Sequence, residues 1–238
     1  MIKINLLHSF FSNHFHPWSR AFIATSFGAL LSLVFPYCAS AAAEMSFQLV
    51  QIGHSTNCGS ACPQVISAEG EISNETPDAF LNFMRGNLHS QTRAIVFIHS
   101  PGGKVVASME LGKIFRKLGI AVVVARAQPA AGHNAAHFVG ARCFSACVYA
   151  LMGARKRVIP PESEVGLHRM FLFAHDGPAG AQQRHQDDGE MAAMLQRYSR
   201  SMGISPSLVA TAEHMDPDMV HILSRAEIAK WNLGTPKL

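Results

Sequence analysis

A serine at the start of a predicted helix is the first residue whose type and position suit nucleophilic chemistry. Ser145 stands in the segment C-F-S-A-C, ahead of an apolar run that predicts a short helix from Ser145 to Ala154. Free amides and the positive dipole end of a helix stabilise a developing oxyanion, which suits attack by Ser145 on an acyl carbon with the Ala146 N–H as a donor. The alternative is that Ser145 only caps the helix, a common role of serine.

A glycine turn supplies further candidate donors. The segment S-P-G-G at residues 100–103 follows a predicted strand and precedes a predicted helix. A glycine pair at a strand end lets the backbone approach a ligand closely and direct an amide at it. Gly102 and Gly103 are therefore candidate oxyanion donors, although Pro-Gly-Gly by itself is typical of an ordinary turn.

The elements that must position these residues predict an α/β fold. The expected elements of the first half are strands at 47–52 and 65–72, a helix at 76–87, a strand at 94–99, a helix from 104 to Gly119, and a strand at 120–126. The strand at 94–99 is apolar on both faces, as expected of a buried parallel strand. Strand, glycine turn, helix and strand together form a βαβ unit.

The second half of the chain is less regular. Residues 128–142 lack a clear period and are interpreted as an irregular insertion. The elements expected after it are the helix at 145–154, short strands at 157–159 and 164–168, and helices at 182–202, 205–214 and 224–232. Ser224 and Glu227 have the spacing of a capping box for the last helix.

The N-terminal segment differs sharply from the rest of the chain. Lys3 and Arg20 precede an uncharged, mostly apolar stretch that ends in small residues of the A-x-A type. We interpret residues 1–43 as a signal peptide, followed by one domain at 44–238, and expect export to the periplasm or the extracellular space. The alternative is an uncleaved membrane anchor, because the stretch is long enough to span a bilayer.

The cysteines point to the same compartment. Of five, Cys38 would leave with the leader, and the remaining four form two pairs with three intervening residues, Cys58 with Cys62 and Cys143 with Cys147. An oxidising compartment favours disulfides within each pair, although the sequence does not decide which of the four cysteines pair with each other. A zinc site of all four cysteines, or a cysteine nucleophile, is a weaker alternative.

The order of several motifs resembles a known family. The matching segments are Gly70-Glu71-Ile72, Ser100-Pro101-Gly102-Gly103, the turn at Ser145, and Leu167-His168 after Arg157-Val158-Ile159-Pro160. In this order and spacing the chain, over roughly residues 66–234, resembles the Clp protease proteolytic subunit and its relatives in the crotonase-like fold. The leader and the insertion make it more similar to exported relatives. The resemblance implies repeated ββα units with parallel sheets flanked by helices.

The resemblance also implies a role for each candidate residue. Ser145 would be the nucleophile and His168 its general base, while the amide of Gly102 or Gly103 and that of Ala146 would form the oxyanion hole.

The third member of the implied triad is an acidic residue that precedes the last helix. Asp216-Pro217-Asp218 offers two candidates, and the spacing to the last helix favours Asp216 over Asp218. Either aspartate could instead be a surface turn residue beside the proline.

We therefore expect an exported serine peptidase or related acyl hydrolase with a peptide or protein substrate. The alternatives are a catalytically silent binding or scaffold protein in the periplasm and, less favoured because of the leader, an acyl-CoA-handling enzyme. Scattered basic residues argue against a nucleic-acid partner. The thirteen histidines form no compact metal motif, and no cofactor is expected. A homo-oligomer is compatible with the resemblance, whereas a cytosolic unfoldase ring is not expected.

Overall fold

The computed structural model describes residues 43–53, 62–87, 92–129, 136–174, 177–181 and 183–237. All of the predicted leader except Ala43 lies outside these residues. Over the ranges described, no helix is long and apolar enough to cross a membrane.

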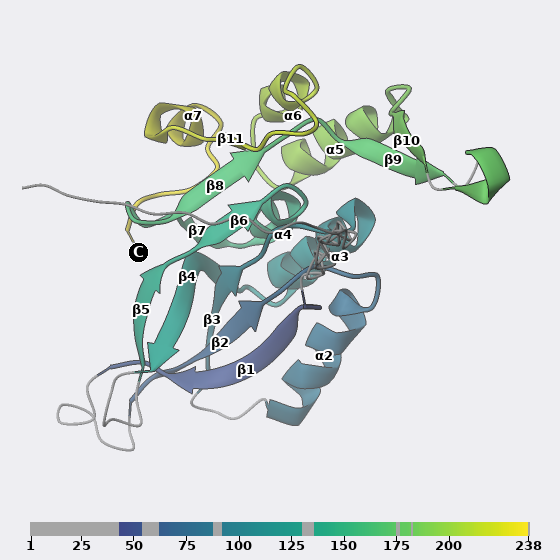
Figure 1. The fold of residues 1–238 in the computed structure, drawn as a ribbon. Coiled ribbons are helices and arrows are strands. Elements are labelled where there is room, and N and C mark those ends of the chain that lie inside the picture. Colours follow the sequence, from purple (N-terminus) through teal and green to yellow (C-terminus); the bar gives the residue numbers. More distant parts are fainter. Residues whose placement is uncertain are drawn as a thin grey trace, which may run out of the picture. The chain divides into compact units, whose positions relative to one another are not determined.

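The main sheet has six strands and is mostly parallel (Figure 1). Its strands are β1 (Ser46–Gln51), β2 (Gln64–Glu69), β3 (Thr92–His99), β4 (Ala121–Pro129), β5 (Ala136–Gly140) and β7 (Lys156–Val158). β2, β3, β4 and β7 pair in parallel, and β1 pairs with β2 in the antiparallel sense. β4 pairs with β7 along its first residues and with β5, antiparallel, along its last.

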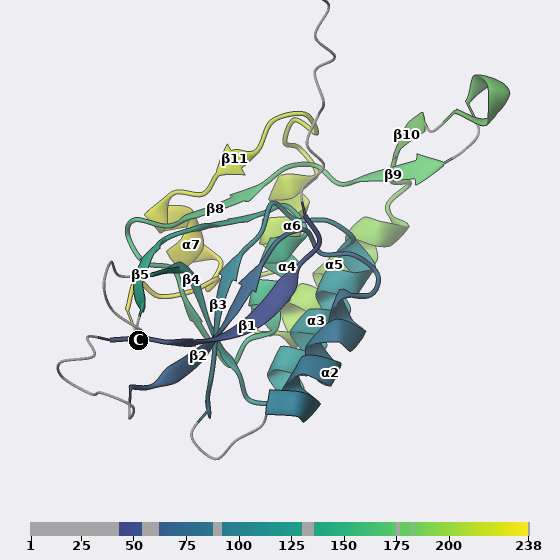
Figure 2. The same ribbon diagram turned by 60° about the horizontal axis from the view of Figure 1, so that its bottom comes forward.

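The parallel strands are apolar on both faces, as the sequence predicts. On β3 and β4, Val96, Ile98 and Val122 face the large core, whereas Phe97 and Val123 belong to a smaller cluster on the other face. The large core lies under helices α2 (Thr76–Asn87), α3 (Val105–Lys117) and α4 (Cys147–Gly153), with α2 and α3 side by side in Figure 2. The structure has a mainly parallel sheet covered by helices (Figure 1), which confirms the predicted α/β fold class.

A second sheet brings the two predicted catalytic segments together. It contains β6 (Arg142–Phe144), β8 (Glu164–Leu167) and β11 (His221–Ile222), and β6 and β8 are parallel neighbours with Phe144 opposite Gly166. Because parallel strands end at the same edge of a sheet, the residues that follow them, Ser145 and His168, lie at one edge.

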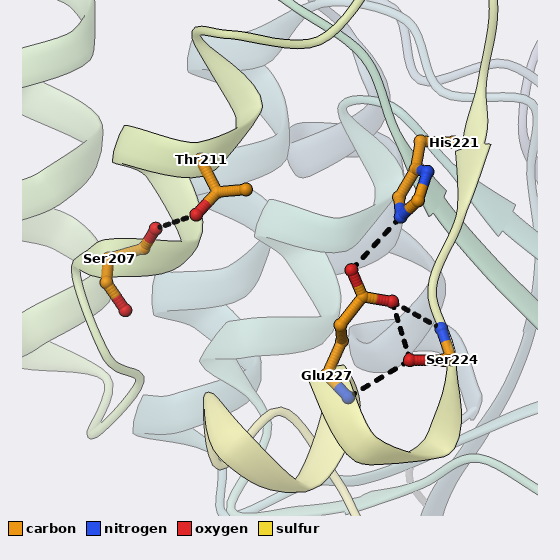
Figure 3. Close-up of polar contacts among 5 residues, drawn as sticks. All are labelled: Ser207, Thr211, His221, Ser224 and Glu227. Carbon is orange, nitrogen blue, oxygen red and sulfur yellow. Dashed lines mark hydrogen bonds and ion pairs between the residues drawn. The ribbon is translucent and has the colours of Figure 1, made fainter.

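The remaining elements are a hairpin and three helices. β9 (Phe171–Ala174) and β10 (Gln183–Gln186) form the antiparallel hairpin, with a short 3-10 turn, η2 (Pro178–Gly180), between them. The helices are α5 (Glu190–Ser201), α6 (Ser207–Ala212) and α7 (Arg225–Lys230). α7 begins with the predicted capping box, in which Ser224 Oγ accepts from the Glu227 amide and the Glu227 carboxylate accepts from the Ser224 amide (Figure 3).

Two predictions about elements are wrong. The segment 128–142, expected to be irregular, contains the end of β4, the whole of β5 and the start of β6, with residues 130–135 outside the described ranges. The helix expected at 182–202 begins only at Glu190, because Gln183–Gln186 pairs with β9 as a strand. β9 itself was not predicted.

Candidate active site

The turn at Ser145 holds a non-glycine residue in a left-handed conformation. Ser145 has φ of 54°, which costs on the order of 1–2 kcal/mol for a residue with a Cβ. Its amide donates to the Gly166 carbonyl at 2.8 Å, which fixes the turn against β8. α4 begins two residues later, with Ala146 as its N-cap and no side-chain capping bond, so the alternative in which Ser145 only caps this helix is wrong.

A disulfide spans the same turn. Cys143 and Cys147 are bonded, with Cα atoms 5.3 Å apart, and both are fully buried. The predicted local pair is confirmed, and neither sulfur is free to act as a nucleophile or a zinc ligand in this state. Cys62 is also disulfide-bonded. Cys58 lies outside the described residues, so the second pairing stays a prediction.

The glycine turn is built into the end of the main sheet and leaves no room for side chains. Gly102 and Gly103 have φ of 117° and 133°. A Cβ on Gly102 would lie 2.9 Å from the Cβ of Ser145, and one on Gly103 would lie 2.1 Å from the carbonyl oxygen of Ile72. The Ile72 amide donates to the Gly102 carbonyl at 2.8 Å, and the Lys104 amide to the Ile72 carbonyl at 2.8 Å. These bonds fix the turn to Ile72, and the close approach of Gly102 to Ser145 leaves the turn beside the candidate nucleophile.

The hydrogen bonds distinguish between the candidate oxyanion donors. The Gly102 amide donates to Ser100 Oγ at 3.1 Å and is therefore occupied. Within the ranges that the structure describes, no hydrogen bond uses the amides of Gly103 and Ala146. The arrangement favours Gly103 and Ala146 over Gly102 as the pair able to receive an oxyanion.

His168 has one ring nitrogen, Nδ1, in a hydrogen bond, and the described residues offer no hydrogen-bond partner to the other, Nε2. Its Nδ1 lies 2.8 Å from the Arg169 carbonyl oxygen, a contact in which the nitrogen must be the donor. In the neutral ring Nε2 then carries the lone pair, as a general base requires. The ring also stacks on Phe171, with centroids 5.8 Å apart.

Ser145, Gly103 and His168 line one cleft of about 430 Å³. No hydrogen bond joins Ser145 to His168 in the described part of the chain, and such bonds often tighten only when substrate binds. The rest of the wall includes the side chains of Val106 and Leu172, which are 49% and 43% exposed. The wall from Met170 to Leu172 could not be predicted from the sequence, because the short apolar run of β9 has no period that would mark it as a strand.

The two candidate acids make other contacts. Asp216 accepts a hydrogen bond from the Asp218 amide at 2.7 Å, and Asp218 forms an ion pair with Arg184; both aspartates are exposed. The Arg184 guanidinium lies over the Phe171 ring at 4.3 Å, and this ring stacks on His168. Asp218 is therefore linked to His168 through Arg184 and Phe171, and no direct contact between the two occurs in the described ranges. The role of Asp216 or Asp218 as a third triad member stays a prediction.

A second group of serine, histidine and carboxylate occurs at the start of α7 (Figure 3). His221 Nε2 lies 3.1 Å from Glu227 Oε1, and Ser224 Oγ donates to Glu227 Oε2 at 2.7 Å. Here the carboxylate separates the serine from the histidine, so the imidazole cannot take the proton of the hydroxyl. The group stabilises the helix start and offers a natural control for the site at Ser145.

The described residues contain no group of three histidine, cysteine, aspartate or glutamate side chains placed to hold a metal ion.

Comparison with known proteins gives structural neighbours only. No family model and no curated protein matches the chain. A solved serine-to-alanine mutant of a membrane-bound stomatin-specific protease is 19% identical, with a TM-score of 0.49, covering 70% of this chain and 74% of that chain. A lysine-to-alanine mutant of a protein with the same name, solved in complex with a substrate peptide, is 20% identical, with a TM-score of 0.48, covering 70% of each chain. At these values the likeness transfers no activity, substrate or catalytic residue.

Proposed function

We propose that the protein is an exported serine peptidase or related acyl hydrolase in which Ser145 is the nucleophile and His168 the general base. The observation that carries this proposal is the left-handed turn at Ser145, which lies in the same cleft as a histidine whose Nδ1 is already engaged. Backbone strain of this kind concentrates at functional sites.

The reaction follows from the geometry. Ser145 Oγ forms a bond to the substrate carbonyl carbon while its proton passes to His168 Nε2, and the carbonyl electrons move onto the oxygen. The amides of Gly103 and Ala146 stabilise that oxyanion. The leaving group then departs with the proton from His168, and an acyl-enzyme remains. Water attacks the acyl-enzyme, again with His168 as the base, and Ser145 is regenerated.

Export and a peptide substrate are part of the proposal. A disulfide between Cys143 and Cys147 supports an oxidising compartment, where such bonds persist. The exposed apolar side chains of Val106 and Leu172 in the cleft wall support a substrate with apolar side chains, as a peptide can supply.

A fluorophosphonate probe, read by mass spectrometry, tests the nucleophile. We expect covalent labelling at Ser145 in the purified protein, and none at this position in Ser145→Ala. Hydrolysis of peptide and ester substrates should fall by roughly 10⁴-fold or more in Ser145→Ala, as for loss of a nucleophile that acts with its base. His168→Gln should also lose the label at Ser145, because the base that activates the hydroxyl is missing.

Variants at the start of α7 are matched controls. Ser224→Ala and His221→Gln alter a serine and a histidine outside the cleft and should leave labelling at Ser145 unchanged. Retained hydrolysis by Ser145→Ala would show that the serine mechanism is wrong. A folded wild-type protein that neither labels nor hydrolyses would favour the catalytically silent binding protein.

A further inference from the structure

The imidazole of His168 is oriented by a main-chain carbonyl rather than by a carboxylate. A general base needs its proton on Nδ1 and its lone pair on Nε2, and the acceptor at Nδ1 sets this tautomer. Here the acceptor is the carbonyl oxygen of Arg169, the next residue in the chain, at 2.8 Å. The orientation of the base therefore depends on whatever holds the backbone of Arg169 in place.

The side chain of Arg169 is anchored by an ion pair. Its Nε lies 3.7 Å from a carboxylate oxygen of Glu213, and the two side chains are only 29% and 18% exposed. The same Nε is buried and has no hydrogen-bond partner in the described part of the chain. Because the buried Nε has lost its hydration, the attraction of the Glu213 carboxylate offsets part of this cost and favours one position of the side chain.

Glu213 occupies a position that is costly for a carboxylate. It is the C-cap of α6, where the helix dipole disfavours negative charge. Burial raises the pKa of Glu213, whereas the nearby Arg169 lowers it and Asp187 raises it. Asp187 cannot take over the role of counter-ion to Arg169 without leaving the amides of Met191 and Ala192, to which it is bonded at the start of α5.

We propose that Arg169 and Glu213 form a positioning pair, which holds the Arg169 carbonyl as the acceptor of the His168 Nδ1 proton. The effect of this pair on catalysis rests on the proposed function. Its effect on the tautomer of His168 does not, and can be measured without turnover. It acts through the backbone and contacts neither substrate nor the reacting atoms.

Tautomer and kinetics are measured together on the full chain. ¹⁵N NMR of histidine-labelled protein, with the His168 signal assigned from His168→Gln, should show a neutral ring protonated at Nδ1. In Glu213→Gln and Arg169→Met we expect mixed tautomers and a kcat that falls by about 10- to 100-fold with KM nearly unchanged, as when a catalytic group is misplaced without loss of binding.

Two further variants separate positioning from general destabilisation. The double variant Arg169→Glu with Glu213→Arg restores an ion pair and should recover both the Nδ1 tautomer and kcat relative to the single variants. Glu164→Gln removes the exposed ion pair between Glu164 on β8 and Arg142 on the neighbouring strand β6, and should alter neither readout.

Each result decides a different question. An unchanged His168 tautomer with unchanged kcat in folded Glu213→Gln and Arg169→Met would overturn the positioning pair, as would a folded double variant as impaired as the single ones. If Glu213→Gln does not fold, Arg169→Met and the double variant decide by the same criteria. Full hydrolysis by Ser145→Ala would instead overturn the proposed function and leave the NMR result standing.

Discussion

At the scale of single residues, backbone strain separates Ser145 from the rest of the chain. The only other non-glycine residue with positive φ among those described is Asn232, which has φ of 57° just after α7. Asparagine tolerates this conformation, and its side chain donates to the Gly203 carbonyl at 2.8 Å. Among the residues that the structure describes, the Ser145 side chain has no such hydrogen bond, and the turn is held instead by the Ser145 amide and the disulfide. The fold therefore carries this strain at the proposed nucleophile.

Removing the side chain at position 145 should release that strain. We expect Ser145→Gly to be more stable than Ser145→Ala by about 0.5–1 kcal/mol, because relief of the left-handed strain outweighs the greater freedom of glycine in the unfolded chain. Urea denaturation of both variants measures the difference. Both should lack hydrolysis. Equal stability of the two would mean that the turn is not strained in solution. Gly119, which has φ of 70° and open space around it, gives a reference when changed to alanine.

At the scale of elements, the turn between β6 and α4 is spanned by a disulfide. The bond between Cys143 and Cys147 closes a loop of only a few residues, for which chain entropy predicts about 2 kcal/mol of stabilisation. We expect Cys143→Ala with Cys147→Ala to lower the free energy of unfolding by about that amount and to reduce kcat more than it raises KM. Denaturant titration and steady-state kinetics measure the two effects. Full kcat in the double variant would show that the turn holds Ser145 without the bond.

The sequence predicted the elements that have a strong apolar pattern and missed those that depend on pairing. α2 has the predicted bounds, and the parallel strands β3 and β4 are where apolar residues occur on both faces. β10, with the sequence QRHQ, has no apolar pattern of its own. It is a strand because β9 supplies its hydrogen-bond partners.

The candidate site was predicted to a similar extent. The resemblance in motif order grouped Ser145, Gly102 or Gly103, and His168, and the structure has Ser145, Gly103 and His168 in the lining of one cleft. Ser145 and His168 directly follow the strands β6 and β8, and Gly103 lies in the turn between β3 and α3. The acceptor at His168 Nδ1 is a backbone atom of Arg169, and a backbone acceptor leaves no mark in the residue types of a sequence.

At the scale of the whole molecule, Glu213, the partly buried acid of the positioning pair, makes the free energy of unfolding depend on pH. The pKa of Glu213 is raised above the ordinary value of 4.5, chiefly by burial, so that the folded state binds this proton more tightly than the unfolded state. Its contribution to stability is therefore fully present below pH 4.5 and is lost as the pH rises through the folded pKa. The free energy of unfolding should therefore fall as the pH rises through the folded pKa of Glu213, and we expect Glu213→Gln to remove this part of the fall. Denaturant titrations from pH 4 upward measure the effect.

Glu227 provides the control of opposite sign. Hydrogen bonds from Ser224 lower the pKa of Glu227, so its contribution is present above pH 4.5 and is lost as the pH falls through the folded pKa. Glu227→Gln should therefore flatten the acid limb of the stability curve. If Glu213→Gln changes that limb in the same way as Glu227→Gln, the raised pKa of Glu213 is wrong.

The covalent bond across the Ser145 turn bears on when the protein becomes competent. Cys143 and Cys147 are reduced when the chain leaves the ribosome, and their bond forms only where the surroundings accept electrons from thiols. Under the proposed function, a hydrolase whose nucleophile depends on that bond would be dormant during synthesis and would mature only after the proposed export. Such an order would protect the proteins of the producing cell without a propeptide or a dedicated inhibitor.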